Sequence, residues 1–419
     1  MNVQEVAAQY GEYLIEKRRY FHQHPEVSTK EYHTSKAIKE ALDEIGVSWR
    51  PCGLETGVLV TIQGAKPGKT ILLRGDMDAL TVQETTGAPY ASKNEGIMHA
   101  CGHDCHIAML LTATRILHDM KEELCGTVKL AFQPAEEVAL GAKSMVEQGA
   151  LDGVDACFAI HVWTDVKSGM VSLEAGPRMA SADEFHITVK GKGCHGAQPE
   201  RGVDAAVVTA AIINNLQSVV SREISPMDPA VVTVGTIQAG TRWNVVAENS
   251  YMTGTTRCFS NEVWETFEER MERVIKGTAE AYRAEAELEY LRIVPPTVND
   301  EAVVSIAQKS AVAVLGENCL ASNPATTGGE DFSYFMQRVP GAIALLGTGN
   351  EALSLIHISE PTRPYFMQRV PGAIALLGTG NEACGAVWPN HSGNFCVDEA
   401  QLLKGAMLYA QVAMDFNAQ

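Results

Sequence analysis

The sequence predicts an α/β protein with a mostly parallel sheet and a smaller α+β domain inserted into it. Short apolar runs alternate with helical stretches up to about residue 182, and the α/β pattern returns at 301–316. Between these two parts, the order of elements changes to β-α-β-β-α-β. Strands that alternate with helices form largely parallel sheets covered on both faces. The larger domain should therefore comprise 1–182 and 294–419, and the inserted domain 183–293.

The first part of the chain supplies most elements of the larger domain. Residues 4–48 have helical periodicity, with a break at HPEVS (24–28). The elements expected after it are strands at 57–64 and 70–80, a helix at 106–120, a strand running into a loop at 127–137, a helix at 141–151 and a strand at 155–163. In such sheets, ligands bind beyond the carboxyl ends of the strands. The unusual polar residues at those ends are Asp76, Asp78, Glu136, Glu137 and His161.

The inserted region predicts an antiparallel sheet with two helices on one face. Its expected elements are strands at 184–193, 231–240, 249–259 and 287–296, and helices at 203–221 and 261–284. This order is the split βαβ arrangement.

Composition narrows the class of protein. The 419 residues include 33 Lys and Arg against 51 Asp and Glu, a net charge of −18 that disfavours nucleic-acid binding. The first 21 residues lack the apolar core of a signal peptide, and no window offers about 18 uninterrupted apolar residues. The ten cysteines form no C-x-x-C pair, so we expect core residues or ligands rather than disulfides. These features predict a soluble, cytoplasmic protein that binds neither nucleic acid nor membrane.

An internal repeat interrupts the last part of the chain. YFMQRVPGAIALLGTGNEA occurs at 334–352 and again, without a change, at 365–383. The intervening string LSLIHISEPTRP (353–364) resembles the translation of a sequencing-library transposon adapter. Because evolved repeats diverge, we interpret 353–364 and one copy of the repeat as a sequencing or assembly artefact; the alternative is a recent duplication. Two identical strands then compete for one place, and one copy must loop out.

The densest group of potential metal ligands is MHACGHDCH (98–106). Cys101 and His103 are two residues apart on a loop that leads into a helix, so both can turn toward one cation. A thiolate with an imidazole suits zinc, and manganese or cobalt become possible once carboxylates join. The alternative is that some of these side chains are simply buried.

Two adjacent carboxylates, Glu136 and Glu137, end the strand in FQPAEEVALGA. One can bind a metal while its neighbour takes a proton from a water molecule. Alternatively, they are a solvated acidic pair favoured by a helix dipole. His161 ends an apolar strand and His391 lies in the loop WPNHSGNF, and neither indicates coordination by itself.

Taken in order, these motifs resemble one known family. RRYFHQHPEVS, RGDMDAL, MHACGHDCH, FQPAEE, GKGCHGAQP, TRWNVV, GTTRCF, GGEDFSYF and the His391 loop are similar to the metal-dependent amidohydrolase branch of the aminoacylase/carboxypeptidase metallopeptidase clan. That branch includes N-acyl-amino-acid amidohydrolases, hippurate hydrolases and indole-acetyl-amino-acid hydrolases. The resemblance runs from about residue 10 to the carboxyl terminus. It implies a zinc-peptidase-like catalytic domain and a ferredoxin-like lid and dimerisation domain.

The resemblance also implies the site residues. Two divalent ions (Zn, Mn or Co) would be held by Cys101, His103, Glu137, His161 and His391. Glu136 would be the general base, and Asp78 would orient a ligand from behind. His195 would stabilise the oxyanion, often across a dimer, while Asn244 and Arg257 would hold the substrate carboxylate.

The resulting hypothesis is hydrolysis of the amide bond of N-acyl amino acids, which releases an amino acid and a carboxylic acid. A dipeptidase or metallo-carboxypeptidase acting on small peptides is the main alternative, because it would use the same metals. A non-catalytic binding protein and a chain inactivated by its insert are the remaining alternatives.

Overall fold

The structure is a computed structural model that describes residues 2–349 and 388–419. The chain divides into two compact units. The first unit contains Met1–Gly176, Asn299–Pro324 and Tyr334–Gln419, and the second contains Pro177–Val298 and Ala325–Ser333. The second unit thus includes a short return segment in addition to its main stretch.

A mixed eight-stranded sheet forms the centre of the first unit in the described residues. Its strands, in spatial order, are β1 (Ser48–Pro51), β2 (Val58–Gln63), β4 (Cys125–Gln133), β3 (Lys66–Asp76), β5 (Ala156–Lys167), β14 (Gly341–Gly349), β6 (Val171–Ser172) and β13 (Leu320–Ala321). The central strands β4, β3, β5 and β14 run parallel to one another. Antiparallel pairs occur at β1–β2, β2–β4 and β14–β6. The predicted α/β class with a mostly parallel sheet is therefore confirmed, with antiparallel pairs toward both edges.

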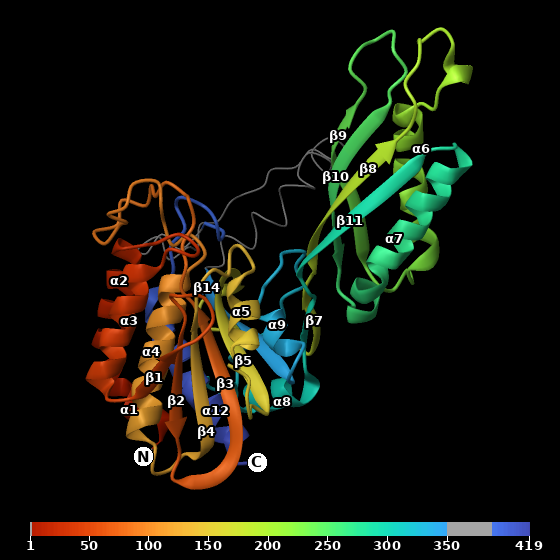
Figure 1. The fold of residues 1–419 in the computed structure, drawn as a ribbon. Helices are drawn as coiled ribbons and strands as arrows, with labels where there is room; N and C mark the ends of the chain where they lie inside the picture. The colour runs from red at the N-terminus through yellow and green to blue at the C-terminus, as the bar shows by residue number, and fades with distance from the viewer. Residues whose placement is uncertain (1, 350–387) are drawn as a thin grey trace, which may run out of the picture. The chain divides into compact units, whose positions relative to one another are not determined.

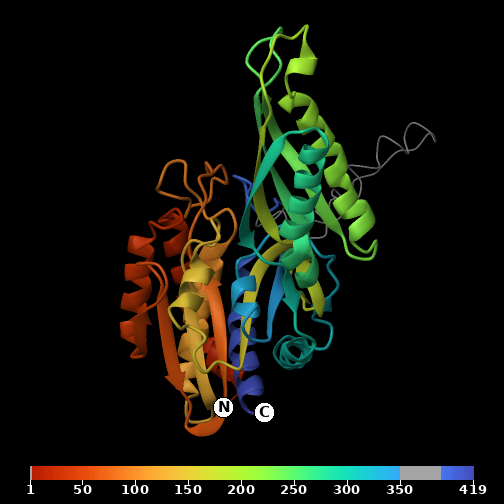
Figure 2. The same cartoon turned by 45° about the vertical axis from the view of Figure 1, so that its right-hand side comes forward.

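Helices cover this sheet (Figures 1 and 2). They are α1 (Val3–Ala7), η1 (Ala8–Tyr10), α2 (Gly11–Gln23), α3 (Tyr32–Ile45), α4 (His103–Asp119), α5 (Gly141–Glu147), α8 (Glu301–Leu315), α9 (Ser333–Met336), η4 (Glu399–Gln401) and α12 (Leu402–Asn417). Helices α4 and α12 pack against β3 and against each other, while α2 and α3 pack on α4. Helices α4 and α12 approach closely at Gly405, where a Cβ atom would lie 2.2 Å from the sulfur of Met109.

The apolar strands and helices bury a continuous core. Ile71, Leu73, Val128, Leu130 and Phe158 on β3, β4 and β5 are fully buried between the helices. The predicted helical stretch 4–48 forms α1 to α3, with the break at 24–31. Strand β1 is an edge strand that begins at the last residue of that stretch, and its short, mostly exposed sequence gave no apolar signal.

The second unit has its own four-stranded antiparallel sheet, in the order β11-β8-β10-β9. Its elements are β8 (Ala182–Lys190), η2 (Pro199–Arg201), α6 (Ala205–Ser218), η3 (Val219–Glu223), β9 (Ala230–Ala239), β10 (Asn249–Cys258), α7 (Asn261–Ala281) and β11 (Glu285–Val294). Helices α6 and α7 pack on each other and share a separate core with the sheet. The order is β-α-β-β-α-β, as the sequence predicts. Strands β7 (Gly176–Met179) and β12 (Thr297–Asn299) pair separately.

The first copy of the repeated segment occupies a central place in the first unit. Its residues 341–349 form β14, which pairs with β5 on one side and β6 on the other. The string 353–364 and the second copy, 365–383, lie outside the described residues. The first copy therefore fills the position for which the two copies were expected to compete.

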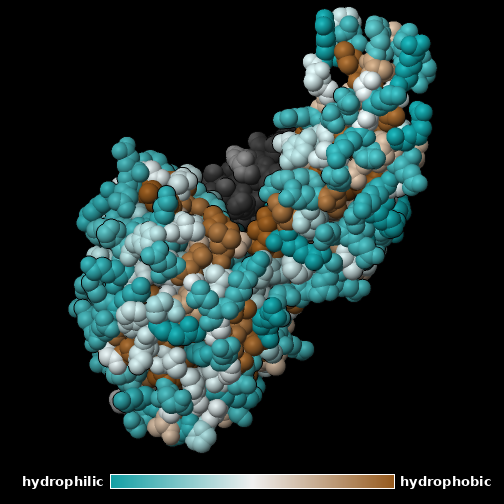
Figure 3. All heavy atoms as spheres, viewed as in Figure 1, coloured by the Kyte–Doolittle hydropathy of each residue, from teal (hydrophilic) through white to brown (hydrophobic). Residues whose placement is uncertain are grey.

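The face of the molecule seen in Figure 3 is mainly hydrophilic, in keeping with the net charge. Among the described residues, no helix combines the length and apolarity needed to cross a bilayer. The described cysteines are free thiols.

Candidate metal centre

The site lies at the position in the sheet where the order of successive strands reverses. Strand β3 has β4 on one side and β5 on the other, so the connections that follow β3 and β4 diverge. Crevices of this kind, beyond the carboxyl ends of strands, are the usual ligand sites of open α/β sheets. Asp76 ends β3, Glu136 and Glu137 follow β4, and His161 lies at the middle of β5.

Cys101 and His103 enter the site from the loop before α4. Gly102 caps this helix with a left-handed backbone, φ 87°. A Cβ atom at Gly102 would lie 2.3 Å from Cγ2 of Val162, so both conformation and space require glycine. This tight turn places the cysteine and the histidine against the end of β5.

The five predicted ligands come together as two overlapping groups. Cys101, His103 and His161 have ligand atoms within 4.8 Å of one another, and so do Cys101, Glu137 and His391. The Sγ of Cys101 is 3.5 Å from Nε2 of His161, and Oε1 of Glu137 is 3.8 Å from Nε2 of His103. Cys101 is common to both groups, so the arrangement offers two adjoining positions for a cation.

Hydrogen bonds leave the inward-facing atoms of this cluster available. The Nδ1 of His103 donates to the backbone oxygen of Asp78 (2.9 Å), and Nδ1 of His161 donates to the backbone oxygen of Val162 (2.7 Å). Both imidazoles then present an unprotonated Nε2 when neutral. The Nε2 of His103 and Oε1 of Glu137 are buried without a hydrogen-bond partner. Buried polar atoms of this kind are costly unless they are satisfied, and the Cys, His and Glu donor set suits a divalent cation such as zinc.

The local electrostatics differ from one ligand to the next: burial opposes the charged form of His103, but neighbouring acidic groups outweigh it and raise the pKa of its imidazole well above the usual value. Burial, together with the neighbouring His106, holds the pKa of His161 well below its usual value and keeps the imidazole neutral. Burial also raises the pKa of the Cys101 thiol, so ligation requires a cation to displace the proton. Burial raises the pKa of Glu137, although His103 and His391 oppose that shift.

Asp78 organises the residues around it. Its carboxylate accepts hydrogen bonds from the backbone N–H groups of Glu136 (3.0 Å) and Glu137 (3.1 Å) and from Oγ of Ser28 (2.6 Å). Burial opposes ionisation, but the nearby His103 and the Ser28 hydroxyl outweigh it and lower the pKa of Asp78. Ser28 lies in the HPEVS loop, and its part in the site had no local signal in the sequence.

Glu136 lies beside the ligand cluster and is partly accessible. Its Oε2 is 4.0 Å from Nε2 of His103, and its side chain is 12% exposed. Glu137, its neighbour, is 3.7 Å from Nε2 of His391. Both glutamate side chains are 12% exposed and lie near His103, and the contact with His391 belongs to Glu137.

His391 reaches the cluster on a strained loop. Its backbone is left-handed, with φ 70°, and its N–H donates to the backbone oxygen of Ala100 (2.7 Å). Asn390 donates from Nδ2 to the backbone oxygen of Cys101 (3.1 Å). Non-glycine residues in this region cost about 1–3 kcal/mol and cluster at functional sites. The ring is 57% exposed.

The other potential ligands of MHACGHDCH face elsewhere. Both ring nitrogens of His106 form hydrogen bonds within the protein, one with the Asp76 carboxylate and one with the backbone N–H of Val162. His99 and Cys105 are fully buried, and burial lowers the pKa of His99 to about 4. The sequence offered five candidates in this motif, and two of them line the cluster.

The remaining predicted residues belong to the second unit. The backbone N–H of Gly196 donates to the backbone oxygen of Asn244 (2.9 Å), so the loops of His195 and Asn244 are neighbours. Arg257 lies near the far end of β10, eight residues beyond Asn249, or roughly 26 Å at about 3.3 Å per residue. Glu330 and Asp331 are also in this unit and are buried.

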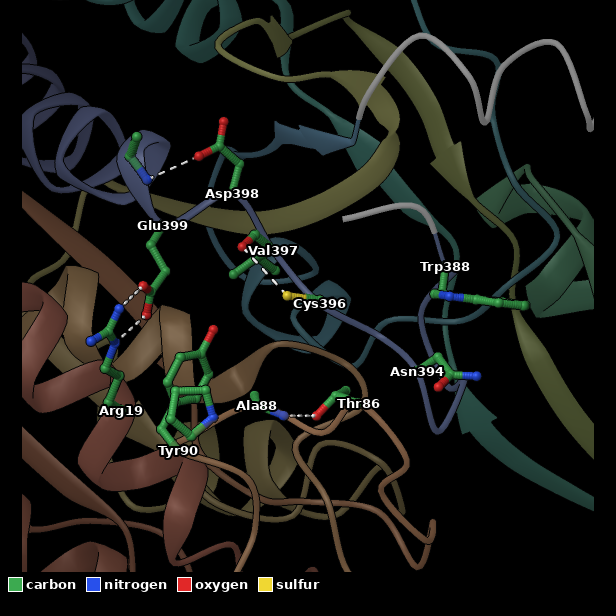
Figure 4. A pocket seen from close by; sticks show the side chains of 12 residues that line it. Arg19, Thr86, Ala88, Tyr90, Trp388, Asn394, Cys396, Val397, Asp398 and Glu399 are labelled. Atoms are coloured by element: carbon green, nitrogen blue, oxygen red, sulfur yellow. Dashed lines mark hydrogen bonds and ion pairs between the residues drawn. The ribbon is translucent and has the colours of Figure 1, made fainter. Parts of the chain in front are cut away.

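A separate cavity of about 620 Å³ lies in the first unit (Figure 4). Figure 4 shows the Arg19 guanidinium facing Glu399, with Tyr90 alongside; the Arg19 Nη2 to Glu399 Oε2 distance is 2.6 Å. None of the five predicted ligands lines this cavity. Its arginine is already paired, so we assign the chemistry to the Cys101 cluster.

Comparison with known proteins gives a consistent result. The profile of Peptidase family M20/M25/M40 matches residues 72–362. The chain is 41% identical over 343 residues to an N-acetyl-L-cysteine deacetylase of Bacillus subtilis (strain 168), covering 81% of each chain. It is 37% identical over 410 residues to thermostable carboxypeptidase 1 of Saccharolobus solfataricus, covering 97% of this chain and 96% of the relative.

A solved structure matches the fold as well as the sequence. The YXEP protein of Bacillus subtilis, described as a dinuclear metal-binding peptidase from the M20 family, superposes with a TM-score of 0.78. It is 33% identical, and the match covers 97% of this chain and 98% of that one.

Proposed function

The chain belongs to peptidase family M20/M25/M40, and from that premise we propose that it hydrolyses the amide bond of N-acyl amino acids, releasing an amino acid and a carboxylic acid. The observation that carries this proposal is the buried cluster of Cys101, His103, Glu137 and His161 with unpartnered inward-facing atoms, next to a second carboxylate. The deacetylase relative favours an acyl amino acid as substrate.

Two divalent ions (Zn, Mn or Co) fit this donor set. The residues that would hold them are Cys101, His103, Glu137, His161 and His391. When bound, such ions polarise the scissile carbonyl and lower the pKa of a water molecule from 15.7 toward about 7. Asp78 fixes the backbone of both glutamates and orients His103, so the ligands are held in place before any ion arrives.

Glu136 is the general base of the proposed mechanism. It takes a proton from the attacking water and later delivers a proton to the nitrogen of the departing amine. Its partial exposure and its place beside the ligand cluster support this role. The proton is held on a carboxylate oxygen of Glu136 between these two transfers.

The second unit supplies the substrate contacts. We assign His195 to the developing oxyanion, and Asn244 and Arg257 to the substrate carboxylate, to which a guanidinium can bind with two parallel hydrogen bonds. We place His195 and Asn244, whose loops are neighbours, on the second copy of a homodimer. Exposed apolar side chains near the edge strand β9, with Trp243 91% exposed, support such an interface.

A homodimer of this kind makes a specific prediction. Mixed His195→Ala and Glu136→Gln subunits should recover activity that neither variant has alone, because one intact site forms in each mixed pair. Failure to recover activity in a mixture shown to exchange subunits would exclude the shared site but not the hydrolase.

A carboxypeptidase acting on small peptides is the second candidate, favoured by the relative that covers 97% of the chain.

A cytoplasmic location fits the need for Cys101 as a thiolate, because reducing compartments keep thiols free.

The deciding experiment is metal analysis combined with a substrate panel. Purified protein should contain about two divalent ions per chain, lose activity on chelation and regain it with Zn, Mn or Co. Acetyl-, benzoyl- and indole-acetyl-amino acids should be cleaved faster than dipeptides. Full activity without metal would refute the mechanism, and faster cleavage of dipeptides would favour the second candidate.

A further inference from the structure

Strands β3 and β5 separate next to the metal centre. Their pairing ends at Arg74 and Ala159, while β5 continues to Lys167. The N–H groups of β5 that point toward β3 therefore lose their strand partner beyond this position. Unpaired backbone groups in a buried region must find other acceptors.

Side chains from two helices satisfy those groups. The N–H of Ile160 donates to Oη of Tyr409 on α12 (2.9 Å), and the N–H of Val162 donates to Nε2 of His106 on α4 (2.9 Å). The Tyr409 hydroxyl in turn donates to the backbone oxygen of Arg74 (2.7 Å). Both side chains are fully buried, and together they close the gap between the strands.

The tautomer of His106 follows from its partners. Because Nε2 accepts the Val162 N–H, the proton is on Nδ1, which donates to Oδ1 of Asp76 (2.5 Å). The other oxygen of Asp76 accepts from Nη1 of Arg74 (2.5 Å). His106 thus has no lone pair left for a cation, although Asp76, His103 and His106 lie close enough to resemble a metal-binding group.

The same Val162 residue holds the ligand His161. Its carbonyl accepts the Nδ1–H of His161 (2.7 Å), while its N–H is held by His106. The rings of His106 and His161 are in edge contact, with centroids 4.5 Å apart. A displacement of this backbone would rotate the His161 ring and move its Nε2 away from Cys101.

We infer that His106 is a positioning residue that holds the Val162 backbone and thereby presents Nε2 of His161 to the metal. The inference rests on the proposed metal site. It assigns to His106 the orientation of a ligand rather than coordination of an ion. It makes the His161-containing half of the site dependent on His106. The half formed by Glu137 and His391 is held by different contacts, those of Asp78 and Ala100.

The test is a cobalt titration of the full chain after metal removal, followed by calorimetry and visible absorption. The variants are His106→Leu, which removes both hydrogen bonds, and His106→Gln, whose amide offers an acceptor and a donor on one planar group. His161→Ala identifies the binding step that belongs to its half of the site. Leu117→Ala, a core truncation near the other end of α4, controls for lost stability.

We expect wild type to bind two ions. His106→Leu should weaken the step identified by His161→Ala by about 10–100-fold and leave the other step within about twofold. His106→Gln should restore most of that affinity, and Leu117→Ala should lower the melting temperature without changing either step.

Three results would overturn the inference. They are unchanged binding in His106→Leu, equal weakening of both steps, and a third ion in wild type that both His106 variants lose, which would make His106 a ligand. A wild type that takes up no cobalt would overturn the proposed metal site itself and this inference with it.

Discussion

The Nε2 of His391 lies 3.7 Å from Oε1 of Glu137, which joins the last part of the chain to the loop after β4. The loop of His391 is in turn fixed to Ala100 by its own backbone. The site therefore depends on contacts from four separate segments of the first unit. Glu137 contacts both His103 and His391, whereas the contact described for Glu136 is with His103.

This difference predicts opposite behaviour for two isosteric substitutions. Glu136→Gln should retain the metal content of wild type and lose about 10²–10⁴-fold in kcat, because it removes only the proton carrier. Glu137→Gln should lose metal first, and its activity should rise again when excess metal is added. Metal analysis and kcat measured on the same samples distinguish the two. A Glu136→Gln variant near the wild-type rate would show that another group is the base.

Two adjacent arginines share one partner but differ in burial. Arg18 contacts Asp104 (3.0 Å) and Glu399 (3.1 Å) and is 1% exposed, while Arg19, 46% exposed, contacts the same Glu399. Arg18→Gln should destabilise the protein by up to about 3–5 kcal/mol, since it takes the guanidinium away from the buried Asp104, which then depends on Nδ1 of His22 (2.8 Å). Arg19→Gln should cost less than about 1 kcal/mol.

Urea unfolding of both variants, compared with wild type, measures these costs. Equal destabilisation by Arg18→Gln and Arg19→Gln would mean that burial does not govern the strength of this pair. Asp104 is the second residue of α4, directly after His103, so the Arg18 variant should also weaken metal binding.

The sequence was sufficient for the strands and helices whose apolar pattern is strong. Strands β3 and β5 are buried runs that end in polar residues, and both the runs and the polar ends are visible in the sequence. Strand β1 was not predicted because it is an exposed edge strand of four residues. Its position depends on pairing with β2, which no local pattern reveals.

The roles of His103 and His106 show what a sequence cannot separate. They are three residues apart and lie on neighbouring positions of α4, so both are equally eligible as ligands. Their different tasks depend on Asp78 and Val162, which other segments bring into contact. The clustering of potential ligands thus indicated where the site lies. The separate roles of its residues could be assigned only from their contacts in the folded chain.

The free energy of unfolding at acid pH should depend in part on Asp398, whose side chain caps η4. Burial alone would raise the pKa of its carboxyl, but hydrogen bonds outweigh burial and lower it. These come from Oγ of Ser168 (2.6 Å), Nε2 of Gln401 (2.9 Å) and the backbone N–H of Ala400 (3.1 Å). A lowered pKa in the folded state stabilises the protein above the unfolded value of about 3.9, and this contribution is lost as pH falls through the folded value.

Asp398→Asn should therefore be less stable than wild type by about 1 kcal/mol at pH 7, and the difference should shrink as pH falls below about 4. Asparagine keeps the helix cap, so the comparison isolates the charge. Unfolding free energies measured at several pH values test this. A difference that stays constant with pH would exclude the carboxylate as its source.

Deletion of the duplicated segment should raise the melting temperature of the protein without loss of activity. Deleting 353–383 leaves 388 residues with a single copy of the repeated segment, and it retains β14 between β5 and β6. Because the first copy already lies between β5 and β6, a second identical strand-forming sequence raises the risk of misfolding and aggregation. We expect the shorter chain to melt at a higher temperature, by about 2–4 °C for each kcal/mol gained, with equal or higher kcat/KM. A full-length control with 353–364 replaced by a Gly/Ser string of equal length separates the effect of that string from the effect of the duplicate. Equal melting temperature, solubility and activity in all three chains would contradict the artefact interpretation and favour a tolerated duplication.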